Sequence, residues 1–172
     1  VRMRTDYLDA FFLHSCPRSL LEREELLRAL ETVVQQGKVR LAGYSGDNEP
    51  LLYAVQSKRF GAIETSLNVC DQHALLESVP LAHEQSMAVI AKRSIANAPW
   101  RFAKRPIGDY AEAYWERLQA MQLDPSPLSW EAYAIRFTAF LPGVTTCILG
   151  TANEAHLRTA VAAVAQGPLS TE

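Results

Sequence analysis

The sequence lacks the long apolar runs, the clustered cysteines and the excess charge that mark several classes of protein. No apolar stretch approaches the roughly 18 residues that a membrane-spanning helix needs, and no signal peptide is visible. The net charge of −2 provides no general attraction for nucleic acid or for an anionic membrane surface. We therefore expect a chain that binds neither nucleic acid nor membrane.

Cysteines are few and far apart. The three cysteines, Cys16, Cys70 and Cys147, are odd in number, and no two of them have the spacing of metal ligands. Isolated cysteines of this kind are typical of free thiols in a reducing compartment. We therefore expect a cytoplasmic protein without a metal site.

Low-complexity segments and long polar linkers are also absent. The 172 residues are 48% hydrophobic and 21% charged, which is ordinary for a globular protein and enough to build a core. We expect one domain over residues 1–172.

Alternating strands and helices fill the chain instead. Its opening apolar run, Asp6-Tyr7-Leu8-Asp9-Ala10-Phe11-Phe12-Leu13-His14, is typical of a fully buried parallel strand. Strands are predicted at 6–14, 39–44, 62–67, 87–91 and 145–149. Helices are predicted at 19–36, 47–58, 73–85, 109–121 and 127–140 and after Thr151, and a long excursion runs from 94 to 126.

This alternation favours a parallel sheet with right-handed crossovers. Five strand–helix units would make either a small doubly wound sheet or five-eighths of a (β/α)8 barrel. No G-x-G-x-x-G follows any strand, which argues against the dinucleotide-binding form of the doubly wound sheet.

Two helix starts match a capping box, in which the N-cap hydroxyl and a side chain three residues on satisfy free backbone N–H groups. They are Ser19 with Glu22 and Thr151 with Glu154. The last helix is expected to turn an apolar face inward. That face consists of Leu157, Ala160, Val161 and Val164.

Two places combine polar residues with strand ends, where parallel sheets and barrels carry their chemistry. His14 ends the first strand and is either a hydrogen-bonded core residue or a donor to a substrate carbonyl. Gly150-Thr151-Ala152-Asn153 joins the last strand to its helix. That turn is an N-cap by Thr151 or Asn153, an anion site, or both.

Three segments carry a family resemblance. Thr5 to His14 resembles the fourth strand of the aldo-keto reductases, and Leu30 to Ser45 resembles their next helix, turn and fifth strand. Ile148 to Leu157 resembles the eighth strand and the start of the last helix. The resemblance implies a (β/α)8 TIM barrel, of which the chain supplies about five βα units. Residues 1–172 would be the C-terminal portion of a single barrel domain, from strand 4 through the last helix.

The resemblance implies an oxidoreductase that reduces aldehydes or ketones by hydride transfer from NADPH, with NADH as the alternative. His14 would be the catalytic residue that orients the carbonyl. The family's proton-donating tyrosine, with its lysine and aspartate, belongs to the first three barrel strands, so we expect the 172 residues alone to be inactive. No oligomeric state is specified.

The resemblance also implies a set of cofactor-binding residues. Ser45 and Glu64 would face the nicotinamide carboxamide, and Lys92 the nicotinamide ring. Arg93, Ile95 and Asn97 would line the pyrophosphate path, Gly150, Thr151, Asn153 and His156 would hold the adenosine end, and Trp100 would wall the substrate pocket. Three positions depart from the family pattern: Gly46 replaces an asparagine, Glu64 a glutamine and Lys92 an aromatic residue.

A run of basic residues supports a phosphate site. Between 92 and 105 the chain has five cations and no acid. The run begins at the end of a strand, where barrel loops bind phosphates, although such runs are commonly solvated faces. Two other functions remain open: a non-catalytic barrel that binds nicotinamide cofactor and regulates a partner, and a barrel lyase or isomerase.

Overall fold

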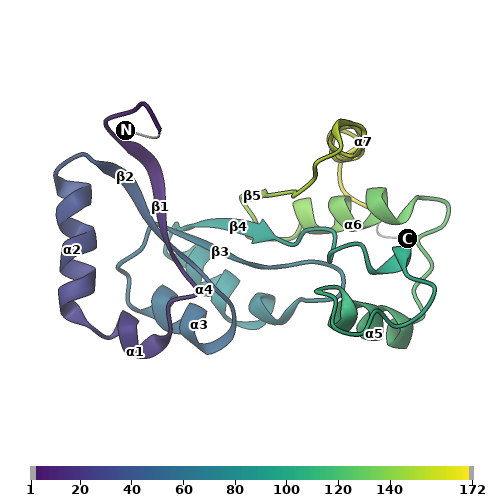
Figure 1. Cartoon of the computed structure of the whole chain (residues 1–172), viewed down its shortest axis with the longest axis horizontal. Coiled ribbons are helices and arrows are strands. Elements are labelled where there is room, and N and C mark those ends of the chain that lie inside the picture. Colours follow the sequence, from purple (N-terminus) through teal and green to yellow (C-terminus); the bar gives the residue numbers. More distant parts are fainter. Residues whose placement is uncertain (1–2, 171–172) are drawn as a thin grey trace. The chain divides into compact units, whose positions relative to one another are not determined.

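The computed structural model describes residues 3–170 and divides into two compact units. The first unit comprises the described residues up to Thr65 together with Ala74–Ile90. The second comprises Ser66–His73 and the described residues from Ala91 onward. The fold is α/β with five parallel strands, as the alternating pattern predicts (Figure 1).

The first unit is a parallel sheet with helical crossovers. Strands β1 (Leu8–His14), β2 (Val39–Ser45) and β3 (Ala62–Ser66) are hydrogen-bonded in that order, followed by β4 (Ala88–Lys92). The last residues of β3 and β4 belong to the second unit. The crossovers are α1 (Arg18–Leu21), α2 (Glu24–Gln35), α3 (Asn48–Gln56), η1 (His73–Leu76) and α4 (Ser78–Glu84).

The strand β1 is less buried than its apolar sequence predicts. It lies at the edge of the strand order, with β2 as its one hydrogen-bonded neighbour, and Phe11 is 42% exposed. The prediction of a fully buried strand is therefore wrong. Within the described residues β1 has a neighbouring strand along one edge alone, so part of its surface stays exposed. Burial increases inward, and Tyr44 and Ile63 are almost fully buried.

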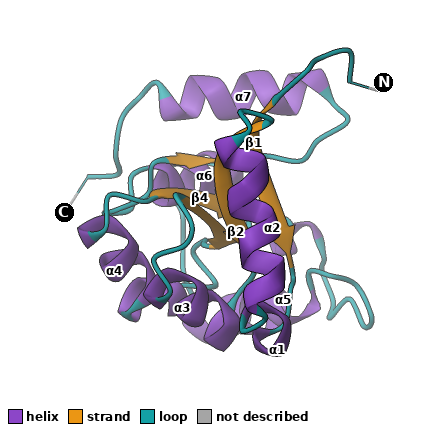
Figure 2. Ribbon diagram, turned by 90° about the vertical axis from the view of Figure 1, so that its left-hand side faces the viewer, coloured by secondary structure: helices purple, strands orange, loops and turns teal. Residues whose placement is uncertain are grey.

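The first predicted helix is two helices. Pro17 precedes α1, and Arg23, in an extended conformation, separates α1 from α2. The capping box at Ser19 and Glu22 is wrong, because Ser19 lies inside α1 and the Glu22 carboxylate pairs with Arg18. The α2 helix packs along β2, as Figure 2 shows, through the predicted stripe that includes Leu27 and Leu30.

The second unit contains the long excursion and the last strand. Its elements are η2 (Pro99–Arg101), α5 (Glu112–Met121), α6 (Trp130–Ala139), β5 (Thr146–Cys147) and α7 (Glu154–Val164). Hydrogen bonds from the Ile148 N–H to the Ala91 carbonyl and from Ser94 Oγ to the Ile148 carbonyl, of 3.0 and 2.9 Å, hold β5 beside β4. The core of the unit consists of Val69, Cys70, Ala96, Tyr114 and Leu118, with Trp100, Trp130, Tyr133 and Phe137 packed against it.

The last helix is largely exposed. The α7 helix packs on α6, where Ala163 is buried, but Leu157 and Val161 are 48% and 62% exposed. The prediction that these two residues face inward is wrong, because the apolar stripe of α7 is wider than its contact with α6. The Thr151–Glu154 capping box is also wrong: Asn153 is the N-cap, and its side chain accepts from the Ala155 N–H at 2.9 Å.

No helix within residues 3–170 has the length and apolar character needed to cross a bilayer.

Candidate functional site

Three polar side chains form a row across the first unit. In the β1–β2 register His14 pairs with Ser45, and in the β2–β3 register Ser45 pairs with Glu64. Residues paired in parallel strands lie on the same face, and all three lie near the C-terminal ends of their strands. We call His14, Ser45 and Glu64 the strand-end row. The fold therefore brings together three site residues that are far apart in the sequence.

Ser45 is the buried member of the strand-end row. Its side chain is fully buried, and Oγ has no hydrogen-bond partner among the described residues. A buried hydroxyl without a partner costs about 1–3 kcal/mol, so such a group in a native fold needs an explanation. A ligand that both accepts from this hydroxyl and donates to it would remove the cost, and to reach it the ligand has to displace the atoms that cover it.

The outer members of the row are accessible. His14 is exposed and Glu64 is half-buried. No ion pair or hydrogen bond joins the Glu64 carboxylate to another described side chain, so its charge is available to a ligand.

The residue that follows the row is a glycine because Tyr44 occupies the space of a side chain. A Cβ on Gly46 would lie 2.5 Å from the Tyr44 hydroxyl oxygen. That hydroxyl donates to the Cys16 carbonyl at 2.9 Å, and burial raises the pKa of Tyr44 to about 12. Tyr44 pairs in register with Leu13 and Ile63, so it lies on the opposite face of the sheet from Ser45. The departure at Gly46 therefore has a steric cause.

Asn48 is the first asparagine after Gly46, but it lies outside the sheet and does not take the place of the family's asparagine at position 46. Asn48 begins α3, is exposed and has a left-handed backbone with φ of 56°.

A cavity of about 930 Å³ lies in the second unit. Seven of the predicted site residues line it together: Arg93, Ile95, Asn97, Trp100, Gly150, Thr151 and His156. Asn153 does not line it but contacts His156, with Nδ2 3.4 Å from the imidazole Nε2. Lys92 is not among the lining residues either.

The loop after β4, which contributes residues to the cavity wall, has a strained backbone. Arg93, Ala96, Asn97 and Ala98 have φ values of 54°, 50°, 58° and 51°. Left-handed backbone is costly for residues with a Cβ and accumulates at functional sites. Sequence reasoning missed this feature, because alanine carries no signal for that conformation.

The basic run after β4 is not a free patch of positive charge. Arg101 pairs with Asp109, Arg105 pairs with Glu112 and Glu116, and the Arg93 guanidinium donates to Ser66 Oγ at 2.7 Å. The paired acids lie on the segment just beyond the run, in and before α5. Counting charges only from 92 to 105 overlooked them.

Trp100 is held in a fixed orientation on the cavity wall. Its ring stacks on Trp130 with centroids 5.5 Å apart and planes 9° apart, and its Nε1 donates to Glu131 at 2.9 Å. Arg101, from the basic run, also lines the cavity, together with Tyr110 and Glu131, which the sequence did not single out.

Solved structures share this fold. An aldo-keto reductase from Bacillus halodurans in its holo form matches with a TM-score of 0.76 and 21% identity, over 98% of this chain and 59% of that one. An aldo-keto reductase from Klebsiella pneumoniae in complex with NADPH matches with a TM-score of 0.69 and 20% identity, over 99% of this chain and 57% of that one. The chain thus spans somewhat under two thirds of these proteins, and the likeness confirms the predicted fold class.

No curated protein sequence matches the chain. The model of the aldo/keto reductase family, however, matches residues 1–172. This chain belongs to the aldo/keto reductase family.

Proposed function

We propose that the protein takes part in NADPH-dependent reduction of aldehydes or ketones to alcohols, with NADH as the alternative cofactor. The observation that carries the proposal is the strand-end row, with its buried and unpartnered Ser45 Oγ beside an exposed imidazole. Membership of the aldo/keto reductase family supports it.

In this proposal His14 is the catalytic residue of the described chain. Its imidazole lies at the end of β1 and is accessible to a substrate. A ring N–H that donates to the carbonyl oxygen orients the substrate and stabilises the negative charge that develops there, as an oxyanion-hole donor does. The nicotinamide cofactor supplies the hydride when it is bound.

The first unit would hold the nicotinamide end of the cofactor. A carboxamide offers both an amide N–H and a carbonyl oxygen, which fits the unpartnered hydroxyl of Ser45. The Glu64 carboxylate can accept from the amide nitrogen but cannot donate to the oxygen. We also assign Lys92 a place against the nicotinamide ring, on the family resemblance alone.

The second unit would hold the phosphates and the adenosine. Its cavity has the size of a small-molecule site and is lined by Arg93, Ile95 and Asn97 and by the turn that begins α7. Gly150, Thr151, Asn153 and His156 belong to that turn or its first helical turn, where backbone N–H groups favour an anion. Trp100, with its fixed ring, is assigned to the substrate side of the wall.

We further propose that residues 1–172 are the C-terminal part of a single barrel domain, and that preceding strands supply the tyrosine, lysine and aspartate. Tyr44 of the first unit does not suit the role of proton donor. Its hydroxyl lies on the face of the sheet opposite Ser45 and donates to the Cys16 carbonyl, and burial raises its pKa to about 12. The 172 residues by themselves are therefore expected to be inactive. The three free cysteines support our proposal of a cytoplasmic location.

The same observation on Tyr44 favours a second candidate. If no proton donor lies beside His14, the protein binds nicotinamide cofactor and regulates a partner without turnover. The coding sequence that precedes residue 1 separates the two candidates: an upstream tyrosine, lysine and aspartate favour the reductase.

The proposal is tested by calorimetric titration of the protein with NADPH. Ser45→Ala should weaken binding by about tenfold, as expected for one lost hydrogen bond. Ser19→Ala, an exposed serine on α1, is the matched control and should bind as the wild type does. In the full-length protein His14→Ala should then abolish most turnover of a generic aldehyde while cofactor binding persists. Absence of any NADPH binding by the wild type would refute the proposal.

A further inference from the structure

The strand-end row carries the negative charge of Glu64. The cation that the proposed function puts against the nicotinamide ring, Lys92, already interacts with another group. The Glu64 carboxylate makes no ion pair with a described residue. Five arginines of the first unit form ion pairs, each with a carboxylate other than Glu64. The pairs are Arg18 with Glu22 and Glu49, Arg23 with Glu25, Arg28 with Glu24, Arg40 with Asp9, and Arg59 with Glu24 and Glu31. Asp47, the acid two residues after Ser45, accepts from Thr65 Oγ1 at 2.9 Å and has the same sign as Glu64.

We propose that Glu64 makes this site discriminate between the two redox states of nicotinamide and bind the oxidised form more tightly. The inference rests on the proposed function, which puts the nicotinamide against the row. The oxidised ring carries one positive charge and the reduced ring is neutral. A half-buried carboxylate attracts the first and has no net charge to attract in the second.

A neutral amide at this position would not discriminate in this way. It contributes similar hydrogen bonds to both redox states, because the carboxamide itself is unchanged between them. The charge of Glu64 therefore sets the preference between the oxidised and the reduced cofactor, which a hydrogen bond to the carboxamide does not.

The preference has a consequence for catalysis. The reduced cofactor would supply a hydride, with its two electrons, to the carbonyl carbon, and the tyrosine that the proposed function places in preceding strands would supply the proton to the carbonyl oxygen. The ring that remains is cationic, so the Glu64 carboxylate stabilises the product side of the hydride transfer. The same attraction slows release of the oxidised cofactor.

Glu64→Gln tests the inference, because it removes the charge and preserves the size and one acceptor of the side chain. Affinities for NADP⁺ and NADPH are measured by calorimetry on wild type and variant, and the ratio of the two dissociation constants is compared. We expect the variant to lose about three- to tenfold of the wild-type preference for NADP⁺, the size of one partly screened charge pair.

Two controls isolate the effect. Glu84→Gln on α4 makes the same change of net charge at an exposed position and should leave the ratio unaltered. 2′-Phosphoadenosine 5′-diphosphoribose, which lacks the nicotinamide ring, should bind wild type and Glu64→Gln equally.

The outcomes separate the inference from the proposed function. An unchanged ratio in Glu64→Gln, or equal weakening of both redox forms, overturns the inference and leaves the proposed function standing. Failure of the wild type to bind either form overturns the proposed function itself. A changed affinity for the ringless analogue would show that Glu64 acts elsewhere and would also overturn the inference.

Discussion

Arg136 of α6 clamps the segment that follows α7 through the carbonyl of Gly167. Its Nε donates to that oxygen at 2.8 Å, and Nη2 donates to the neighbouring Pro168 carbonyl at 2.6 Å. Both carbonyls belong to residues beyond Ala165, the C-cap of α7, so the guanidinium ties the chain just after the helix to α6. A planar guanidinium with several donors in fixed geometry suits them well.

Removal of this clamp should loosen α7. We expect Arg136→Ala to lower the free energy of unfolding by about 1–2 kcal/mol, for lost hydrogen bonds to a charged donor. Urea denaturation followed by circular dichroism measures the change. Arg158→Ala, which breaks an exposed pair with Glu154 on the same helix, is the control and should cost less than about 0.5 kcal/mol. Equal losses in the two variants would argue against the clamp.

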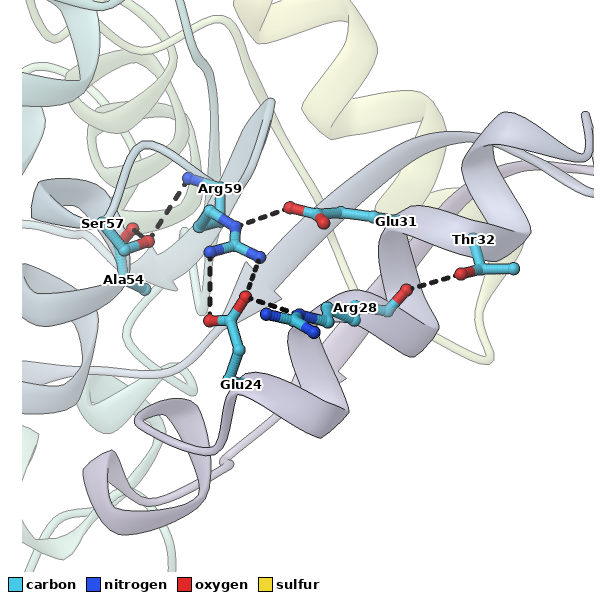
Figure 3. A network of polar contacts seen from close by, with 7 residues as sticks. All are labelled: Glu24, Arg28, Glu31, Thr32, Ala54, Ser57 and Arg59. Carbon is cyan, nitrogen blue, oxygen red and sulfur yellow. Dashed lines mark hydrogen bonds and ion pairs between the residues drawn. The ribbon is translucent and has the colours of Figure 1, made fainter.

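A second arginine joins elements of the first unit and makes its stability depend on pH. Arg59 binds Glu31 at 2.6 Å and Glu24 at 3.3 Å, and Glu24 also accepts from Arg28 (Figure 3). These hydrogen bonds from Arg59 and Arg28 lower the pKa of Glu24 below its usual value.

Because the pKa of Glu24 is depressed in the folded state, its contribution is present above the unfolded pKa and is lost as pH falls through the folded one. We therefore expect the thermal unfolding midpoint to fall on acidification below about pH 4.3, the usual value for glutamate. In Arg59→Met this acid dependence should become shallower. Lys58→Met, the neighbouring cation, serves as the control, and a slope altered as much by Lys58→Met would contradict the assignment.

Restoring the family asparagine at position 46 should damage the protein. A Cβ there meets the Tyr44 ring, so Gly46→Asn should destabilise the fold by about 1–3 kcal/mol, as overpacking usually does. Denaturant unfolding gives the change. Gly150→Ala is the control, because a Cβ at position 150 would have no neighbouring atom within 4 Å. A Gly46→Asn variant as stable as the wild type would show that Tyr44 moves aside freely.

In the strained loop after β4, substitution of an alanine by glycine should stabilise the fold, which is uncommon for this substitution. Ala98 has φ of 51°, a conformation that glycine adopts without a Cβ penalty. We expect Ala98→Gly to raise the free energy of unfolding by about 0.5–1 kcal/mol. Ala103→Gly, in the following loop and without a positive φ, should be slightly destabilising in the same denaturation assay. Destabilisation by Ala98→Gly would show that the loop is not strained there.

The positions of the strands could be predicted because each strand carries a local signal. The apolar runs ending at His14 and Tyr44 lie within one or two residues of β1 and β2. The helix boundaries were less predictable. Ser19 matches a capping pattern, but the rigid Pro17 starts the helix earlier and Arg23 interrupts it. Such outcomes depend on neighbours that a four-residue pattern does not include.

The sequence by itself determined the α/β class, the order of the strands and the family, because strand runs, helix stripes and motif order are local properties read along the chain. Only the tertiary structure decided that His14, Ser45 and Glu64 form one row, since register is a relation between strands. It also decided that the arginines after β4 are paired and that Leu157 is exposed. Burial and ion pairing depend on which distant surfaces meet, and no segment of the chain specifies that alone.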